Sequence, residues 1–124
     1  NPLTPETMNM MSTVQFKLMK KSAILINTTR GAVVDQDALY EALKSGELAG
    51  AALDVTVPEP IPADHPLLTL DNCLIMPHVA SATADTRMKM AMMSVENVLA
   101  GVTGDLPPYC VNQAAIAGNA RLKS

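Results

Sequence analysis

Three ionisable side chains follow three separate apolar runs in this sequence. The runs cover residues 23–26, 49–55 and 73–76, and Arg30, Glu59 and His78 come after them in that order. Such short apolar runs are typical of strands that are buried on both faces of a parallel sheet. The carboxyl ends of parallel strands meet at one edge of a sheet, where ligands bind in open α/β folds. We therefore expect the three side chains to converge at that edge.

An arginine, a carboxylate and a histidine together suit the reduction of a keto acid. A guanidinium can hold a substrate carboxylate through two parallel hydrogen bonds. A protonated imidazole can give its proton to a carbonyl oxygen as hydride arrives, and a nearby carboxylate favours that protonated form. Each residue alone also has an ordinary interpretation, because an isolated arginine is mostly a solvated loop residue. The chemistry is therefore indicated only by the three positions together.

The spacing of apolar residues predicts the elements that position these side chains. We expect parallel strands at residues 23–27, 50–55 and 73–76. A helix is predicted over residues 36–45, with Asp35 as its N-cap and Gly46 just after its end. The first two strands and this helix form a strand–helix–strand unit, which implies a right-handed crossover between parallel neighbours.

Two shorter elements are predicted before the first strand. A helical turn is expected at residues 8–11, and a helix over residues 14–21. Val14 and Leu18 stand four residues apart, and together with Phe16 and Met19 we expect them to give the second helix a buried side.

The segment at residues 56–71 is predicted to be a long loop, because it contains four prolines and little periodicity. Long ordered loops are uncommon unless they carry function, and this one holds Glu59. His65 also lies in it. Nothing places His65 after a strand, so we interpret it as a surface or packing residue.

The longest helix is predicted from residue 84 to about residue 100. An apolar stripe at spacings of four, three and four residues runs along it, formed by Met88, Met92, Val95 and Leu99. Such a stripe is more often core or subunit contact than ligand groove. We expect Gly101 and Gly104 to end the helix and the tail beyond Asn112 to be poorly ordered.

Composition indicates a globular domain with a core of its own. The chain has 124 residues, of which 48% are hydrophobic and 17% charged, and its net charge is -3. A net negative charge does not indicate the basic surface that binds nucleic acid or an anionic membrane. No apolar run is long enough for a membrane span. The start does not resemble a signal peptide, so we expect a cytoplasmic protein. No metal site is indicated, and two distant cysteines do not suggest a disulfide framework.

Three motifs, in this order and spacing, resemble the D-isomer-specific 2-hydroxyacid dehydrogenases. They are N-T-T-R-G at residues 27–31, G-A-A-L-D-V at 50–55 with P-E-P at 58–60, and P-H-V-A-S-A-T at 77–83. The resemblance runs from Pro2 to about Asn112. Within the family it is greatest to the glyoxylate and hydroxypyruvate reductases.

The resemblance implies an α/β fold that is the second half of a Rossmann-like doubly wound parallel sheet plus a C-terminal return segment. Residues 1–101 would be the C-terminal half of the NAD(P)-binding domain, and residues 102–124 would return toward the substrate domain. It also implies an oxidoreductase that transfers hydride from NADPH or NADH to a small 2-oxo acid, giving a D-2-hydroxy acid. The full-length protein would be a homodimer.

The resemblance also assigns site residues. The catalytic residues would be Arg30, Glu59 and His78, of which Arg30 and His78 would contact the substrate. The contacts to the cofactor would be Pro2, Thr28, Asp54, His78, Ala80 and Ser81. The family usually has glycine where Ala80 stands, so a methyl group would meet the nicotinamide here.

No arrangement of the six glycines makes a G-x-G-x-x-G turn after a strand. The phosphate-binding apparatus of a dinucleotide domain is therefore missing from this chain. We expect the chain to be the carboxyl-terminal part of a longer enzyme and to be inactive by itself. Two alternatives stay open at this point: an NAD-sensing, corepressor-like binding protein on the same fold, or an inactive fragment.

Overall fold

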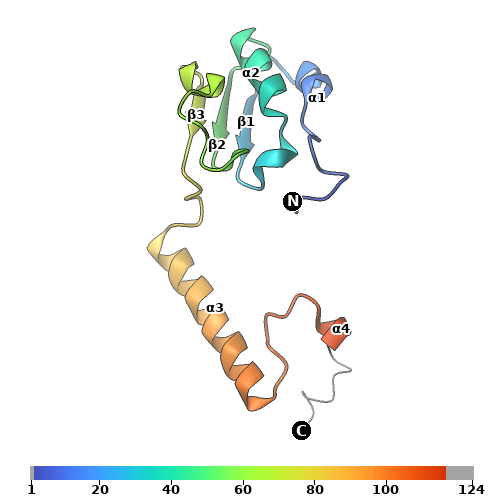
Figure 1. Cartoon of the computed structure of the whole chain (residues 1–124), viewed down its shortest axis with the longest axis vertical. Coiled ribbons are helices and arrows are strands. Elements are labelled where there is room, and N and C mark those ends of the chain that lie inside the picture. Colours follow the sequence, from blue (N-terminus) through green and yellow to red (C-terminus); the bar gives the residue numbers. More distant parts are fainter. Residues whose placement is uncertain (1, 117–124) are drawn as a thin grey trace. The chain divides into compact units, whose positions relative to one another are not determined.

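The three apolar runs form one parallel sheet. Its strands, in spatial as well as chain order, are β1 (Ile24–Asn27), β2 (Gly50–Leu53) and β3 (Cys73–Ile75) (Figure 1). In the register of the sheet Ile26 lies beside Ala52, and Ala52 lies beside Leu74. The predicted strands and their parallel order are confirmed, with ends that differ from the prediction by one or two residues.

The computed structural model describes residues 2–116. The chain divides into two compact units, residues 1–80 and residues 81–124, and the first unit contains the whole sheet. The predicted domain boundary after residue 101 concerns the longer protein, and it stays a prediction.

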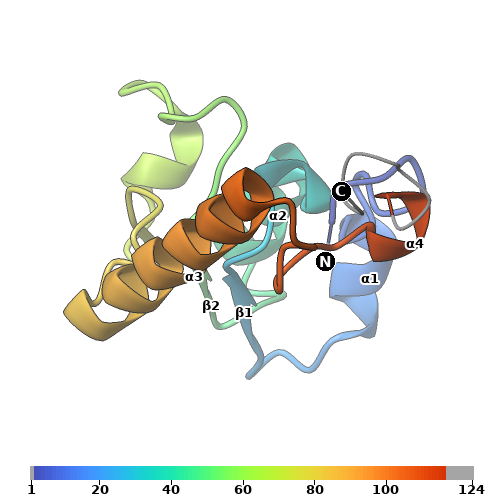
Figure 2. The same ribbon diagram turned by 90° about the horizontal axis from the view of Figure 1, so that it is seen from below.

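One face of the sheet carries the hydrophobic core. Helix α2 (Gln36–Lys44) lies against the sheet in both views (Figures 1 and 2), and α1 (Thr13–Leu18) and the 3-10 helix η2 (Pro66–Thr69) add side chains to the same core. The fully buried members are Phe16, Leu39, Leu48, Leu53, Val55 and Leu67. Burial of each such side chain contributes about 1.5–3 kcal/mol.

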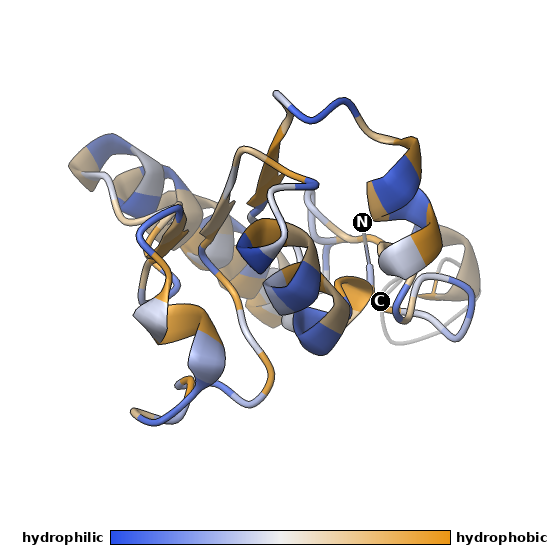
Figure 3. Cartoon of the chain, turned by 90° about the horizontal axis from the view of Figure 1, so that it is seen from above, coloured by the Kyte–Doolittle hydropathy of each residue, from blue (hydrophilic) through white to orange (hydrophobic). Residues whose placement is uncertain are grey.

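The other face of the sheet is also apolar. Its strand residues Ile24, Ile26 and Leu74 are all exposed, and the hydropathy colouring of Figure 3 marks the strands as largely apolar. The strands of parallel sheets normally carry apolar side chains on both faces. The apolar residues on the two faces of this sheet therefore fit the strand type predicted from the apolar runs.

Helix α2 matches its prediction closely. The Asp35 side chain accepts a hydrogen bond from the backbone N–H of Ala38 at 3.0 Å, as an N-cap does. After the helix, Gly46 has a φ of 71°, the left-handed conformation that favours glycine at this place.

The side of helix α1 that was expected to be buried is buried only in part. Phe16 is fully buried, whereas Val14 and Leu18 are 63% and 82% exposed. The helix ends at Leu18, because Met19 is already extended, with a ψ of 157°. In a helix of six residues only a narrow face meets the core, and the large ring of Phe16 occupies it.

The predicted helical turn at residues 8–11 is also wrong at its end, because Met11 forms a parallel bridge with Val34. The Met11 N–H donates to the carbonyl of Val33 at 3.0 Å, and the N–H of Asp35 donates to the carbonyl of Met11 at 2.9 Å. These hydrogen bonds pair Met11 with the extended segment around Val34, so Met11 is not part of a helical turn.

The long loop at residues 56–71 is not without structure, because it contains η2. The Nδ1 atom of His65 accepts a hydrogen bond from the N–H of Leu67 at 3.2 Å and so caps η2. His65 therefore has the structural role that the sequence indicated.

The second unit contains α3 (Ala84–Thr103) and the short helix α4 (Gln113–Ile116). Gly101 lies inside α3 and does not end it, because the left-handed residue is Gly104, with a φ of 83°. None of the α3 residues is buried. Of the tail beyond Asn112 that we expected to be poorly ordered, α4 is helical and residues 117–124 lie outside the described part. Within the described residues no helix has the length and hydrophobicity needed to cross a membrane.

The loops that follow β1 and β2 meet at Gly31. This residue begins the 3-10 helix η1 (Gly31–Val33), and a Cβ atom built on it would lie 2.2 Å from the carbonyl oxygen of Thr56. No side chain fits there, since real Cβ atoms do not approach a backbone oxygen so closely. The two loops are therefore packed backbone to backbone.

This contact predicts the effect of adding one methyl group. Gly31→Ala should destabilise the protein by about 1–3 kcal/mol, because the Thr56 backbone must move. Gly101→Ala is the matched control, since its added Cβ would meet no atom within 4 Å apart from the neighbouring backbone of its own helix, and it should stabilise α3 by about 0.5–1 kcal/mol. Urea denaturation of both variants measures the difference. Equal stability of the Gly31→Ala variant and the wild type would contradict the tight packing.

Candidate active site

The turn after β1 is organised by a buried asparagine. The Oδ1 atom of Asn27 accepts hydrogen bonds from the N–H of Thr29 at 3.0 Å and from its hydroxyl at 2.9 Å. The Nδ2 atom of Asn27 donates to the carbonyl of Arg30 at 3.0 Å. Asparagine side chains often stabilise turns in this way. The turn fixes the backbone of Arg30 just beyond the carboxyl end of the strand.

The guanidinium of Arg30 is exposed, and its Nη1 atom donates to the carbonyl of Thr29 at 2.7 Å. Between residues 2 and 116 the structure records one ion pair, and it joins two other residues, Glu59 and His78. Arg30 therefore keeps donors that could bind an anion, and its predicted role as an anion clamp stays a prediction. A carboxylate is the partner that the planar guanidinium fork binds best.

The carboxylate of Asp54, just after β2, is buried, and both of its oxygens accept hydrogen bonds from backbone N–H groups. One oxygen accepts from the N–H of Val79 at 2.7 Å, and the other accepts from the N–H of Ala80 at 2.9 Å. Hydrogen bonds to an ionised carboxylate are stronger than neutral ones. Asp54 therefore ties the end of β2 to the chain that follows β3.

His78 stands directly before that tied segment in an unusual conformation. Its φ is 54°, in the left-handed region where residues other than glycine are uncommon. The hydrogen bonds that the next two residues donate to Asp54 stabilise the chain just after this turn. His78 is thus held by its backbone, and its side chain is left free to meet a partner.

That partner is Glu59. The Nδ1 atom of His78 lies 2.6 Å from Oε1 of Glu59. Since a carboxylate can only accept, the proton between them lies on Nδ1 of the imidazole. The Nε2 atom is then the one that can face a substrate. The two side chains are 51% and 42% exposed, and ion pairs as exposed as this contribute at most about 1 kcal/mol.

Three predicted cofactor contacts line one pocket at this edge of the sheet. The pocket has a volume of about 220 Å³ and is lined by Ile26, Thr28, Ala52, Leu53, Asp54, Met76, Val79 and Ala80. The walls are mostly apolar, which suits the flat face of an aromatic ring. The structure thus brings Thr28, Asp54 and Ala80 together in one pocket, and their contact with the cofactor stays a prediction.

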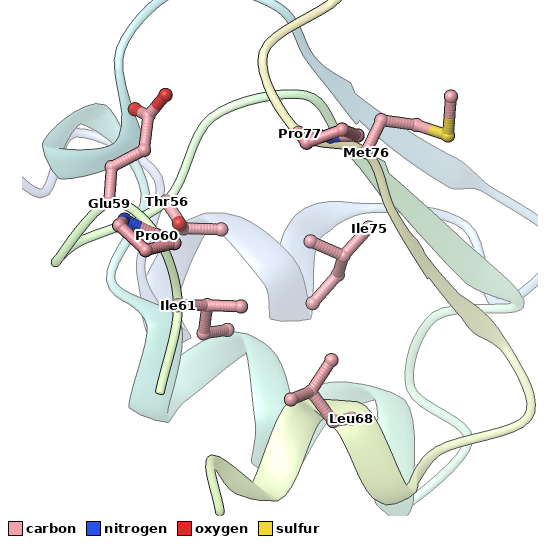
Figure 4. A pocket seen from close by; sticks show the side chains of 8 residues that line it. All are labelled: Thr56, Glu59, Pro60, Ile61, Leu68, Ile75, Met76 and Pro77. Atoms are coloured by element: carbon pink, nitrogen blue, oxygen red, sulfur yellow. The ribbon is translucent and has the colours of Figure 1, made fainter. Parts of the chain in front are cut away.

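A larger pocket of about 540 Å³ lies beside Glu59. In Figure 4 the apolar side chains of Ile61, Leu68 and Ile75 gather in its lower part, and the Glu59 carboxylate points away from them. The carboxylate is therefore directed out of the apolar pocket, and its contact is with His78.

Two predicted cofactor residues are not joined to this cluster by any recorded hydrogen bond of the described chain. The carbonyl of Pro2 accepts from the hydroxyl of Thr7 at 2.9 Å. Ser81 is the first residue of the second unit. Their proposed roles remain predictions.

The thiol of Cys73 is not activated for reaction. Burial raises the pKa of the Cys73 thiol, so little of it is the reactive thiolate. Within residues 2–116 no group of three histidine, cysteine, aspartate or glutamate side chains is arranged to hold a metal ion.

Sequence reasoning missed two residues that shape the site. Asn27 carries a signal that could have been used, because its spacing to Thr29 is that of an asparagine turn. Gln36 carries none. Its Nε2 atom donates to the carbonyl of Val57 at 2.8 Å, and its Oε1 atom accepts from the Val57 N–H at 2.7 Å. The two residues are 21 positions apart, and only the fold brings them together.

Comparisons with known proteins agree with the motifs. Residues 1–80 match the family described as "D-isomer specific 2-hydroxyacid dehydrogenase, NAD binding domain". The chain is 54% identical over 115 residues to the glyoxylate reductase of Korarchaeum cryptofilum, covering 93% of this chain and 35% of that protein. It therefore spans about a third of the length of such curated relatives.

Solved structures give the same result. The TT0316 protein of Thermus thermophilus is 53% identical, with a TM-score of 0.81 over 87% of this chain and 34% of that one. The NADPH-dependent glyoxylate/hydroxypyruvate reductase of Sinorhizobium meliloti, solved with NADP and malonate, is 37% identical. Its TM-score is 0.77 over 86% of this chain and 33% of that one. The Rossmann-type α/β fold expected from the sequence is thereby confirmed.

The geometry at Asp54 predicts a specific loss of stability. Asp54→Asn should destabilise the protein by about 1.5–3 kcal/mol, because the amide keeps one acceptor and turns an NH₂ group toward a backbone N–H. Asp64→Asn, at an exposed position in the loop, is the matched control and should change stability by less than about 0.5 kcal/mol. Urea denaturation compares them, and equal effects would remove the anchoring role.

Proposed function

Because the chain belongs to the D-isomer-specific 2-hydroxyacid dehydrogenase family, we propose that it is part of a reductase that uses NADPH or NADH. Its substrate would be a small 2-oxo acid such as glyoxylate or hydroxypyruvate. The observation that carries the proposal is the 2.6 Å contact between Glu59 and His78, at the sheet edge that also holds Arg30. The relatives named above as glyoxylate reductases support the choice of substrate.

Arg30 would hold the substrate and His78 would supply the proton. The free donors of the guanidinium would bind the carboxylate of the 2-oxo acid, which orients the neighbouring keto group. The protonated His78 would give the Nε2 proton to the keto oxygen while the keto carbon receives a hydride. Glu59 would accept from Nδ1 throughout, so it would keep the ring oriented with Nε2 toward the keto oxygen. The products are a D-2-hydroxy acid and the oxidised cofactor.

The residues that would hold the nicotinamide end of the cofactor are those of the 220 Å³ pocket, above all Thr28, Asp54 and Ala80. A bound NADPH or NADH supplies the hydride. The apolar walls would exclude water from the ring, and the Ala80 methyl group would lie where the family usually has only glycine. The solved relative that contains NADP and malonate supports a site for a dinucleotide beside a small carboxylate.

We propose the remaining features for the full-length protein. Residues 1–101 would belong to its nucleotide-binding domain, and residues 102–124 would return toward its substrate domain. The protein would be a cytoplasmic homodimer, with a small 2-oxo acid rather than nucleic acid or a membrane as its partner. The net charge of -3 favours a small-molecule partner over nucleic acid.

The side chains at the site favour an enzyme over a protein that only binds NAD. A protein that only senses NAD needs neither a proton donor nor a guanidinium for a second ligand. Here Glu59 contacts His78, and Arg30 has free donors at the same edge. The test is an absorbance assay of the full-length protein with NADPH and NADH, using glyoxylate and hydroxypyruvate as substrates. Cofactor binding without oxidation by either acid would reject the proposal.

The role of Arg30 predicts an effect of a charge-conserving substitution. Arg30→Lys should lower kcat/KM for glyoxylate about 10- to 100-fold, because lysine cannot form the two parallel bonds of the guanidinium fork. The affinity for NADPH should stay within about twofold, since Arg30 is not a proposed cofactor contact. Steady-state kinetics and an NADPH titration measure both quantities. An unchanged kcat/KM would remove Arg30 from the substrate site.

A further inference from the structure

Gln36, the first residue of α2, binds both polar groups of one backbone position in the loop that carries Glu59. Its Nε2 atom donates to the carbonyl of Val57 at 2.8 Å, and its Oε1 atom accepts from the N–H of Val57 at 2.7 Å. The two bonds fix the orientation of the amide, because exchanging its oxygen and nitrogen would oppose donor to donor and acceptor to acceptor. The side-chain amide of Gln36 thus pairs with the Val57 backbone as the backbone of a neighbouring strand would.

The loop needs such an anchor because of its composition. Three of the seven residues from 56 to 62 are prolines, which have no N–H group and cannot join a ladder of hydrogen bonds. The hydroxyl of Thr56 donates to the carbonyl of Pro58 at 2.9 Å, which fixes the turn within the loop. The bonds from Gln36 fasten that turn to α2, and Glu59 comes two residues after Val57.

The same loop is also fixed from the β1 side. The backbone of Thr56 contacts Gly31, which directly follows Arg30. The segment before Glu59 is therefore held between the Arg30 turn and the first residue of α2. Movement of Val57 would displace Glu59 from the 2.6 Å contact with His78.

A second polar neighbour of Gln36 does not account for this arrangement. The Nε2 atom of Gln36 lies 3.4 Å from Nε2 of His65. The Nδ1 atom of His65 accepts from the N–H of Leu67, so in the neutral ring the proton lies on Nε2. Donor then faces donor, and the contact is no hydrogen bond. The two hydrogen bonds to Val57 are therefore the ones by which Gln36 holds the loop.

We propose that Gln36 is a positioning residue that acts through Glu59: it holds the proline-rich loop so that the Glu59 carboxylate meets Nδ1 of His78. The inference rests on the proposed function, in which this pair delivers the proton. Gln36 itself would contact neither substrate nor cofactor.

The first test uses the full-length protein and three substitutions. Gln36→Met, which keeps the size but loses both bonds, should lower kcat for hydroxypyruvate about tenfold and leave the Kd for NADPH within about twofold. Gln36→Glu, which can still accept from the Val57 N–H, should lower kcat less. Gln15→Met is the matched control. Gln15 accepts from the Ser12 N–H at 3.2 Å at the start of α1, so its loss should reduce stability but not kcat.

The second test asks whether Gln36 acts through Glu59. In a Glu59→Gln background, adding Gln36→Met should change kcat by less than about twofold, because the contact that Gln36 protects is already lost. Multiplicative effects of the two substitutions, or equal kcat values for Gln36→Met and Gln15→Met, would overturn the inference.

A spectroscopic readout separates this inference from the proposed function. The ¹⁵N NMR shift of the His78 Nδ1 atom should move in Gln36→Met toward its value in Glu59→Gln, and it should stay at the wild-type value in Gln15→Met. A wild-type protein without reductase activity would reject the proposed function, and this signal would still decide the role of Gln36. An unmoved signal in Gln36→Met would overturn that role.

Discussion

The buried carboxylate of Asp54 holds together the chain segments on which the site depends. A buried charge without a cation must find several donors, and here the donors are the backbone N–H groups of Val79 and Ala80. The two N–H groups after β3 also need the carboxylate, because without it they would have to find other acceptors. The bonds fix the distance between the end of β2 and the turn that contains His78. The geometry of His78 thus depends on a residue that does not touch its side chain.

The other parts of the site are also fixed by the backbone. Asn27 shapes the turn of Arg30, and Gly31 brings that turn against the loop after β2. The side chains that would do chemistry are left exposed at the end of this scaffold. An exposed ion pair such as Glu59 with His78 adds little to stability, so the fold does not depend on it.

The sequence was sufficient for those features that have a local cause. Apolar runs predicted the strands, the capping residue Asp35 predicted the start of α2, and Gly46 predicted its end. The contact of Glu59 with His78, and the place of Arg30 after the neighbouring strand, followed from the rule that the carboxyl ends of parallel strands meet at one edge. Their roles in binding and catalysis stay predictions.

Features with a distant cause could not be predicted. The apolar positions of α1 indicated a buried side, but a helix of six residues has room for only one large contact; Phe16 fills it, and Val14 and Leu18 stay exposed. Gly101 could have ended α3, yet the left-handed turn forms at Gly104. Gln36 has no local signal, because its partner is brought near only after the crossover has formed.

The most direct test is the structure of the full-length protein with NADPH and an unreactive analogue of a 2-oxo acid, such as oxamate. The account predicts that the analogue's carboxylate lies on the Arg30 guanidinium and its carbonyl oxygen lies within hydrogen-bond distance of Nε2 of His78. The Nδ1 atom of His78 should still contact Glu59. An analogue bound away from Arg30 and His78, or a separation of Glu59 from His78 in the complex, would contradict it.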